Sequence, residues 1–174
     1  MQQHQDFAVL AATEWSRTLP ELSATDRELA TIIRLSRVAA IQQRLDSSAL
    51  RGFADTGVKG TEDFRVIALL RRSTGGLTNS QLLEQLGGSK AGISTRLERL
   101  RQHGITERLP SKTDRRSHRN LLTSYGEELA DRLVAEVVTA RKQLIDDLPK
   151  KQVQALTDAL GDILAKIDPV AAPN

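Results

Sequence analysis

The feature that most constrains the fold is a pair of short helix-forming segments separated by two glycines. They lie in GLTNSQLLEQLGGSKAGISTRLERLRQHGI, residues 76–105. The first helix opens at Thr78 with the spacing of a capping box and ends at Gly87 and Gly88. Ser89 is the natural N-cap of the second helix, whose apolar stripe consists of Ile93, Leu97 and Leu100. The pattern predicts two helices joined by a tight turn.

A short hairpin rich in arginine follows the second helix. The segments ITERL (105–109) and NLLT (120–123) have strand-like composition, and PSKTDRRSHR (110–119) between them contains turn-forming residues. From 88 to 120 there are nine basic and three acidic residues, a net charge of +6, whereas the whole chain carries +3 and the remainder therefore −3. The basic residues are Lys90, Arg96, Arg99, Arg101, Arg108, Lys112, Arg115, Arg116 and Arg119.

This order of parts favours DNA as the partner. Taken alone, the second helix has the composition of an ordinary solvated surface helix. A preceding helix, a glycine turn and a basic hairpin are what a helix in a DNA major groove requires, with the hairpin tip on phosphates or in the minor groove. An uninvolved charged loop is the alternative for the hairpin.

Helices are also predicted on both sides of this region. They cover about residues 6–18, 23–50, 61–73, 124–148 and 149–167, with Thr61 as a cap and Pro149 in a first turn. We expect a mainly α fold with a small β-hairpin wing: a winged helix-turn-helix DNA-binding domain at 61–123 and a discontinuous helical dimerisation region at 1–60 and 124–174. Residues 1–20 are an additional helix or arm. The terminal helices have more apolar surface than so small a domain can cover, which favours a dimer over a bundle within one chain.

Composition excludes several classes of protein. The chain has no cysteine, and its three histidines are scattered, so we expect no thiol switch, no metal site and no cofactor. No catalytic residues are predicted, because neither a nucleophile–base pattern nor a phosphate-binding loop occurs. The chain also lacks a membrane-spanning apolar run and a signal-peptide pattern, which predicts a cytoplasmic protein that does not bind membranes.

Residues 76–129, which include DRRSHRNLLTSYG, resemble the winged helix-turn-helix of the MarR family of bacterial transcriptional regulators, and the similarity extends over about 25–167. The resemblance implies an obligate homodimer with intertwined terminal helices on a palindromic operator. It implies that the recognition helix contacts DNA through Ser89, Lys90, Ser94, Thr95 and Arg99. It also implies that Arg116 of the wing enters the minor groove with Asp114 as its partner. Arg96 departs from the usual apolar residue, and the N-terminal extension is longer than in many members.

The complete predicted DNA-binding set is therefore Ser89, Lys90, Ser94, Thr95, Arg96 and Arg99 in the helix, and Lys112, Asp114, Arg115, Arg116 and Arg119 in the wing. The resemblance also suggests a repressor that a small anionic, often aromatic, ligand releases from DNA. Trp15, Phe53, Phe64 and Arg65 are candidate ligand contacts, although core or surface roles explain them as well. The alternative function is a winged-helix protein-interaction module that docks an acidic partner without specific DNA binding.

Overall fold

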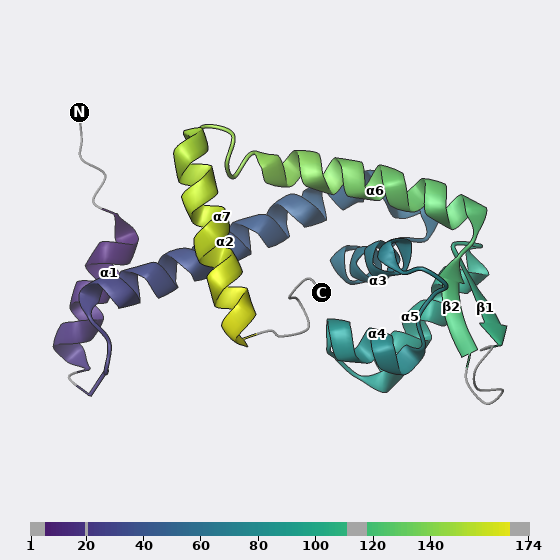
Figure 1. Cartoon of the computed structure of the whole chain (residues 1–174), viewed down its shortest axis with the longest axis horizontal. Helices are drawn as coiled ribbons and strands as arrows, with labels where there is room; N and C mark the ends of the chain where they lie inside the picture. The colour runs from purple at the N-terminus through teal and green to yellow at the C-terminus, as the bar shows by residue number, and fades with distance from the viewer. Residues whose placement is uncertain (1–5, 20, 111–117, 168–174) are drawn as a thin grey trace. The chain divides into compact units, whose positions relative to one another are not determined.

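The computed structural model describes residues 6–19, 21–110 and 118–167 (Figure 1). It divides into two compact units, residues 1–44 and residues 45–174. None of the described helices has the length and apolarity needed to cross a membrane. The elements in chain order are α1 (Phe7–Thr18), α2 (Asp26–Leu50), the 3-10 helix η1 (Arg51–Thr56), α3 (Thr61–Arg72), α4 (Asn79–Leu86), α5 (Lys90–Gln102), β1 (Thr106–Pro110), β2 (His118–Leu122), α6 (Ser124–Lys142) and α7 (Lys150–Ile167).

The first unit contains α1 and most of α2. Asp6 caps α1 by accepting a hydrogen bond of 2.9 Å from the backbone N–H of Ala8, and it also forms an ion pair with Arg34. A small apolar cluster joins the two helices, formed by Ala12, Leu29 and Ala30. Many larger apolar side chains of this unit are exposed, including Phe7, Trp15 and Ile32.

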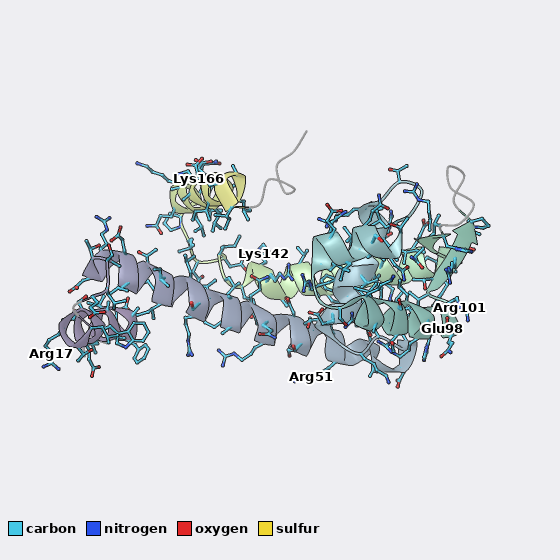
Figure 2. The ribbon with its side chains drawn as sticks, turned by 90° about the horizontal axis from the view of Figure 1, so that it is seen from below. Arg17, Arg51, Glu98, Arg101, Lys142 and Lys166 are labelled. Atoms are coloured by element: carbon cyan, nitrogen blue, oxygen red, sulfur yellow. The ribbon has the colours of Figure 1, made fainter. Side chains whose placement is uncertain are left out.

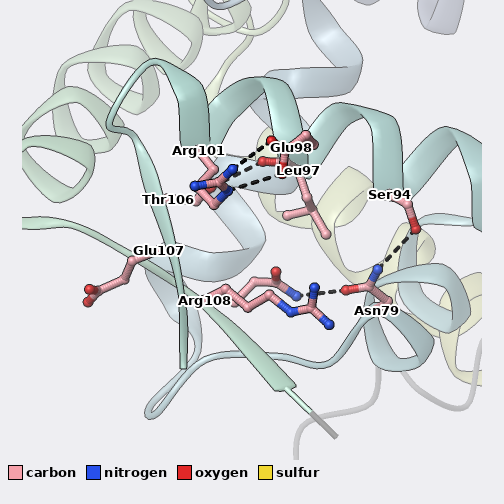
Figure 3. Close-up of a pocket in the computed structure, with 9 residues that line it drawn as sticks. Asn79, Ser94, Leu97, Glu98, Arg101, Thr106, Glu107 and Arg108 are labelled. Carbon is pink, nitrogen blue, oxygen red and sulfur yellow. Dashed lines mark hydrogen bonds and ion pairs between the residues drawn. The ribbon is translucent and has the colours of Figure 1, made fainter. Parts of the chain in front are cut away.

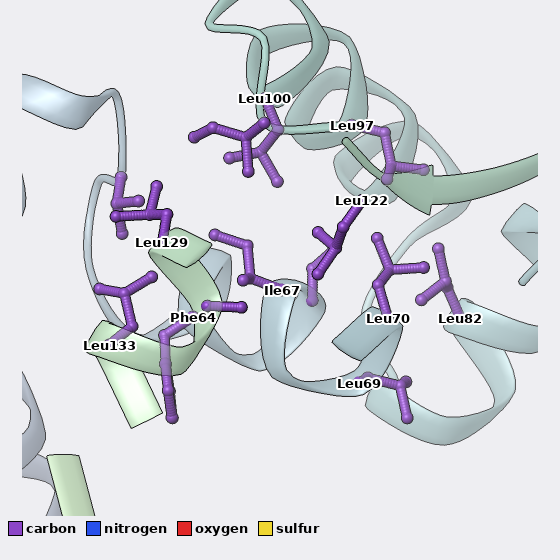
Figure 4. Packing of buried hydrophobic residues seen from close by; sticks show 14 of the residues in the cluster. Phe64, Ile67, Leu69, Leu70, Leu82, Leu97, Leu100, Leu122, Leu129 and Leu133 are labelled. Carbon is purple, nitrogen blue, oxygen red and sulfur yellow. The ribbon is translucent and has the colours of Figure 1, made fainter. Parts of the chain in front are cut away.

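The second unit is built around one hydrophobic core (Figure 4). Its centre is α3, whose apolar face packs against α4, α6 and β2. The amphipathic pattern of each helix contributes one stripe to this core. Among the largest fully buried side chains are Ile67, Leu82, Leu100, Ile105, Leu129 and Leu133. The core therefore fixes α4 and α5 against α3 and the hairpin.

The hairpin is a two-stranded antiparallel sheet in which Thr106 is paired with Leu122 and Pro110 with His118. Residue 77 adds an isolated antiparallel bridge to β2, with hydrogen bonds of 3.0 and 2.8 Å between the backbones of Leu77 and Asn120. The segment before α4 is thus tied to the wing. The mainly α fold with a hairpin wing, expected from the sequence, is confirmed.

Two of the predicted N-cap residues, Thr78 and Ser89, are confirmed. Thr78 and Gln81 form the complete capping box, and Ser89 caps α5. The prediction of Thr61 as an N-cap is wrong, since Gly60 occupies that position without a side-chain cap and Thr61 is the first helical residue. The helix predicted to reach residue 148 ends at Lys142, because the following residues form turns.

Candidate nucleic-acid interface

A short turn of three residues, 87–89, connects α4 to α5. Gly87 and Gly88 have φ of 72° and 90°, a region that side-chain-bearing residues rarely adopt. Ser89 then accepts a hydrogen bond of 3.0 Å from the backbone N–H of Gly92. The cap fixes the first residue of α5 and leaves the other N-terminal amides of the helix at an exposed surface, where a helix favours anions such as phosphate.

One face of α5 is buried and the opposite face is exposed. Ile93, Leu97 and Leu100 lie in the core, with exposed fractions of 5% or less. Lys90, Ser94 and Thr95 belong to the exposed side of the helix, together with the cap residue Ser89. Four predicted DNA-contacting residues are therefore accessible on one short segment. Their contact with DNA stays a prediction.

Arg96 and Arg99 have partners inside the unit. Both guanidinium groups bind Oδ1 of Asp63, with distances of 3.1 Å from Arg96 Nε and 2.6 Å from Arg99 Nη2. Arg99 Nη1 also donates to the carbonyl oxygen of Gly57 at 2.8 Å. The Asp63 side chain is only 3% exposed, and the two arginines are 23% and 22% exposed. These arginines link α5 to α3, and a DNA contact for either stays a prediction.

The role of Asp63 was not predicted from the sequence. Its other carboxylate oxygen accepts a hydrogen bond of 2.6 Å from the backbone N–H of Lys59. The signal was present, because Asp63 lies three, four and seven residues before Val66, Ile67 and Leu70, which form the buried stripe of α3. A carboxylate on such a stripe requires charged partners.

The described part of the wing carries exposed and partly buried cations. Arg108 on β1 is exposed, whereas Arg119 on β2 is half-buried and donates to the carbonyl oxygen of Gly76 at 3.1 and 2.6 Å. Arg119 therefore anchors the second strand. The other predicted wing residues, Lys112, Asp114, Arg115 and Arg116, lie outside the described residues.

A polar cleft of about 320 Å³ lies between α5 and the hairpin (Figure 3). Within it, Asn120 Nδ2 donates to Oδ1 of Asn79 at 2.9 Å, and Asn79 Nδ2 donates to Oγ of Ser94 at 3.1 Å. Neither asparagine was predicted from the sequence to belong to the site. Asn120 lies two residues before Leu122 on β2, so both side chains are on the buried face of the strand. A buried asparagine needs hydrogen-bond partners within the protein.

The acidic residue of α5, Glu98, lines the same cleft. Glu98 and Arg101 form an ion pair of 2.6 Å and are about half exposed (Figure 2). Hydrogen bonding from Arg101 holds the pKa of the Glu98 carboxyl below its ordinary value, so Glu98 stays ionised. The Arg101 charge is thus locally balanced, and Lys90 and Arg108 have no ion-pair partner among the residues that the structure describes.

The predicted ligand contacts do not form a common site in the second unit. Phe53 and Phe64 are buried in the core, with Arg132 5.5 Å from the first ring and Arg141 6.0 Å from the second. Arg65 is exposed and bonds to Glu62 and to the carbonyl oxygen of Leu86. In the first unit, Trp15 is 46% exposed on α1. A ligand role for these residues stays a prediction.

The chain is similar to known transcriptional regulators. A model of the MarR family matches residues 56–117. The HTH-type transcriptional regulator PecS of Dickeya dadantii (strain 3937) is 28% identical over 152 residues, which cover 86% of this chain and 88% of that protein.

Two solved structures share the fold. CouR from Rhodococcus jostii RHA1, solved with p-coumaroyl-CoA bound, has a TM-score of 0.63 and 24% identity, and the match covers 74% of this chain and 87% of that one. MepR of S. aureus, solved as a DNA complex, has a TM-score of 0.65 and 16% identity, with 78% and 96% covered.

Proposed function

Since this chain belongs to the MarR family of DNA-binding transcriptional regulators, which are not enzymes, we propose that it recognises a specific double-stranded operator through α5 and the hairpin. The observation that carries this proposal is the exposed face of α5. Lys90, Ser94 and Thr95 are exposed on that face, next to the exposed glycine turn that precedes the helix. Ser, Thr and Lys side chains suit phosphates and base edges in a major groove.

The proposed regulator acts as a homodimer. In the single chain α7 has no buried residue, although its apolar side chains recur on one face. The exposed members of this stripe, with exposed fractions from 39% to 73%, are Leu156, Leu160, Ile163, Leu164 and Ile167. Covering such a stripe is favourable by roughly 25 cal/mol per Å², and a second copy supplies the same stripe.

We assign dimerisation to residues 1–60 and 124–174 and DNA binding to residues 61–123. A twofold dimer spaces two recognition helices by about 34–36 Å, one turn of B-DNA, which requires a palindromic operator. A protein that binds chromosomal DNA in a bacterium acts in the cytoplasm.

Repression relieved by a small anionic aromatic ligand is the regulatory part of the proposal. CouR, which shares the fold, was solved with p-coumaroyl-CoA. Suitable probes are salicylate, a small anionic aromatic compound, and p-coumaroyl-CoA, the ligand in the CouR structure. Binding can be followed by the fluorescence of Trp15, the only tryptophan of the chain, which reports on α1. We expect one probe to raise the unfolding temperature and release bound DNA. Neither effect at millimolar salicylate or micromolar p-coumaroyl-CoA would contradict this part.

A salt titration tests DNA binding itself. Fluorescence anisotropy with a random duplex and with a duplex selected from a random pool should give affinities that fall steeply with salt, because neutralised phosphates release counterions. Lys90→Ala should reduce the slope of log K against log salt by about one. Lys151→Ala, an exposed lysine of α7, is the matched control and should leave the slope unchanged. Undetectable or salt-insensitive binding would favour the protein-interaction module.

A further inference from the structure

Three of the polar side chains that line the cleft, those of Asn120, Asn79 and Ser94, form a hydrogen-bonded series with a defined donor-to-acceptor direction. Its buried end is Asn120, which is 5% exposed and whose Nδ2 lies 3.0 Å from the carbonyl oxygen of Leu77. A carbonyl oxygen only accepts hydrogen bonds, so the amide nitrogen of Asn120 must face it. The side-chain orientation of Asn120 is therefore set by the backbone.

That orientation propagates to Asn79. The Nδ2 of Asn120 has a second hydrogen, and it points to an Asn79 atom 2.9 Å away, which must be the acceptor Oδ1. The amide nitrogen of Asn79 consequently faces Ser94 Oγ at 3.1 Å (Figure 3). The reverse orientation of Asn79 would oppose two NH₂ groups. Ser94 Oγ is therefore an acceptor within the protein.

The hydroxyl hydrogen of Ser94 is left for another acceptor. Serine and threonine in helices commonly donate to the carbonyl four residues earlier, as Thr157 does to Val153 at 2.9 Å and Thr31 to Arg27 at 2.8 Å. The structure gives Ser94 no such bond within its described ranges. Ser94 is exposed on α5, so its O–H is directed to whatever binds that face.

We infer that Asn120 and Asn79 are positioning residues that present the Ser94 hydroxyl to DNA as a hydrogen-bond donor. The inference rests on the proposed function and makes it more specific. A donor selects phosphate oxygens or the major-groove acceptors of guanine, adenine and thymine, and it offers nothing extra to the cytosine amino group.

The test is a double-mutant cycle with a duplex selected by the wild-type protein. In Asn79→Asp the carboxylate has no hydrogen to donate, so it accepts the Ser94 hydroxyl hydrogen and removes it from DNA. Ser94→Ala should weaken binding about tenfold in the wild-type background and less than about twofold in the Asn79→Asp background. Ser80→Asp is the matched control, because it adds the same charge at the residue after Asn79, which takes no part in the hydrogen-bonded series. In the Ser80→Asp background, Ser94→Ala should again weaken DNA binding about tenfold.

Several outcomes would overturn the inference. An equal loss from Ser94→Ala in the wild-type and Asn79→Asp backgrounds would show that Asn79 does not set the direction. No loss in the wild type, with binding otherwise normal, would show that the Ser94 hydroxyl is unused. If the wild-type protein selects no sequence, the proposed function itself fails. Asn120→Val provides a second background without added charge, for use if Asn79→Asp does not fold. In that background the loss of DNA affinity caused by Ser94→Ala should fall to about threefold. A cost that stays tenfold in Asn120→Val would count against the inference.

Discussion

Replacing Asp63 by alanine should destabilise the second unit by about 3 kcal/mol. The carboxylate accepts hydrogen bonds from Arg96, Arg99 and the backbone N–H of Lys59, and its side chain is 3% exposed. Removing one partner of a buried ion pair typically costs about 3–5 kcal/mol. We take the lower end because both arginines are 22–23% exposed and can be hydrated in part.

The assay is unfolding by heat or urea, followed by circular dichroism. For a chain of this size, about 3 kcal/mol corresponds to a lowering of the midpoint by roughly 6–12 °C. Arg99→Ala should cost more than Arg96→Ala, about 2 against 1 kcal/mol, because Arg99 also binds the carbonyl oxygen of Gly57. A loss below about 1 kcal/mol in Asp63→Ala would refute the structural role. Unchanged stability in Arg99→Ala with a changed base preference would indicate that Arg99 contacts DNA instead.

Three further predictions test other parts of the fold. Gly126→Ala should cost about 3 kcal/mol, since its Cβ would lie 2.0 Å from a backbone carbonyl oxygen, whereas Gly161→Ala, which meets nothing within 4 Å, should be neutral or stabilising in thermal unfolding. Thr78→Ala should lower the free energy of unfolding by about 1 kcal/mol through loss of the α4 cap, and an unchanged value in urea titration would contradict that role. Arg71 holds the pKa of Asp131 below its ordinary value of 3.8, so their pair stabilises the fold above that pH and its contribution disappears as pH falls through the folded-state pKa. Asp131→Asn should flatten the acid end of the stability profile, and an identical profile would exclude the pair as a contributor.

The helices of the winged helix-turn-helix were predictable because their signals are local. The capping box at Thr78, the N-cap at Ser89 and the stripe of Ile93, Leu97 and Leu100 depend on residues close in sequence. Thr61 failed as a cap because the same residue types also occur inside a first turn, and the backbone at Gly60 decides between the two positions.

The hydrogen-bond partners of Arg96 and Arg99 were not predictable from local sequence. Helical spacing places Arg96 and Arg99 at the edge of the buried stripe, where solvent, DNA or an internal carboxylate are all possible partners. The choice depends on Asp63, 33 and 36 residues earlier in the chain. The partners of Asn120 are likewise distant in sequence: Asn79, the first residue of α4, is 41 residues away and Leu77, just before that helix, is 43 residues away. Contacts at such separations follow from packing and leave no local pattern.

Hydroxyl-radical footprinting on a duplex selected by the protein tests the central claim most directly. Two copies of α5 on one face of DNA should protect two regions related by twofold symmetry, with centres about 10–10.5 base pairs apart. The protection should disappear in Ser94→Ala combined with Lys90→Ala while the protein stays folded. A single protected region without symmetry, or protection that the double variant retains, would contradict DNA recognition by a pair of α5 helices.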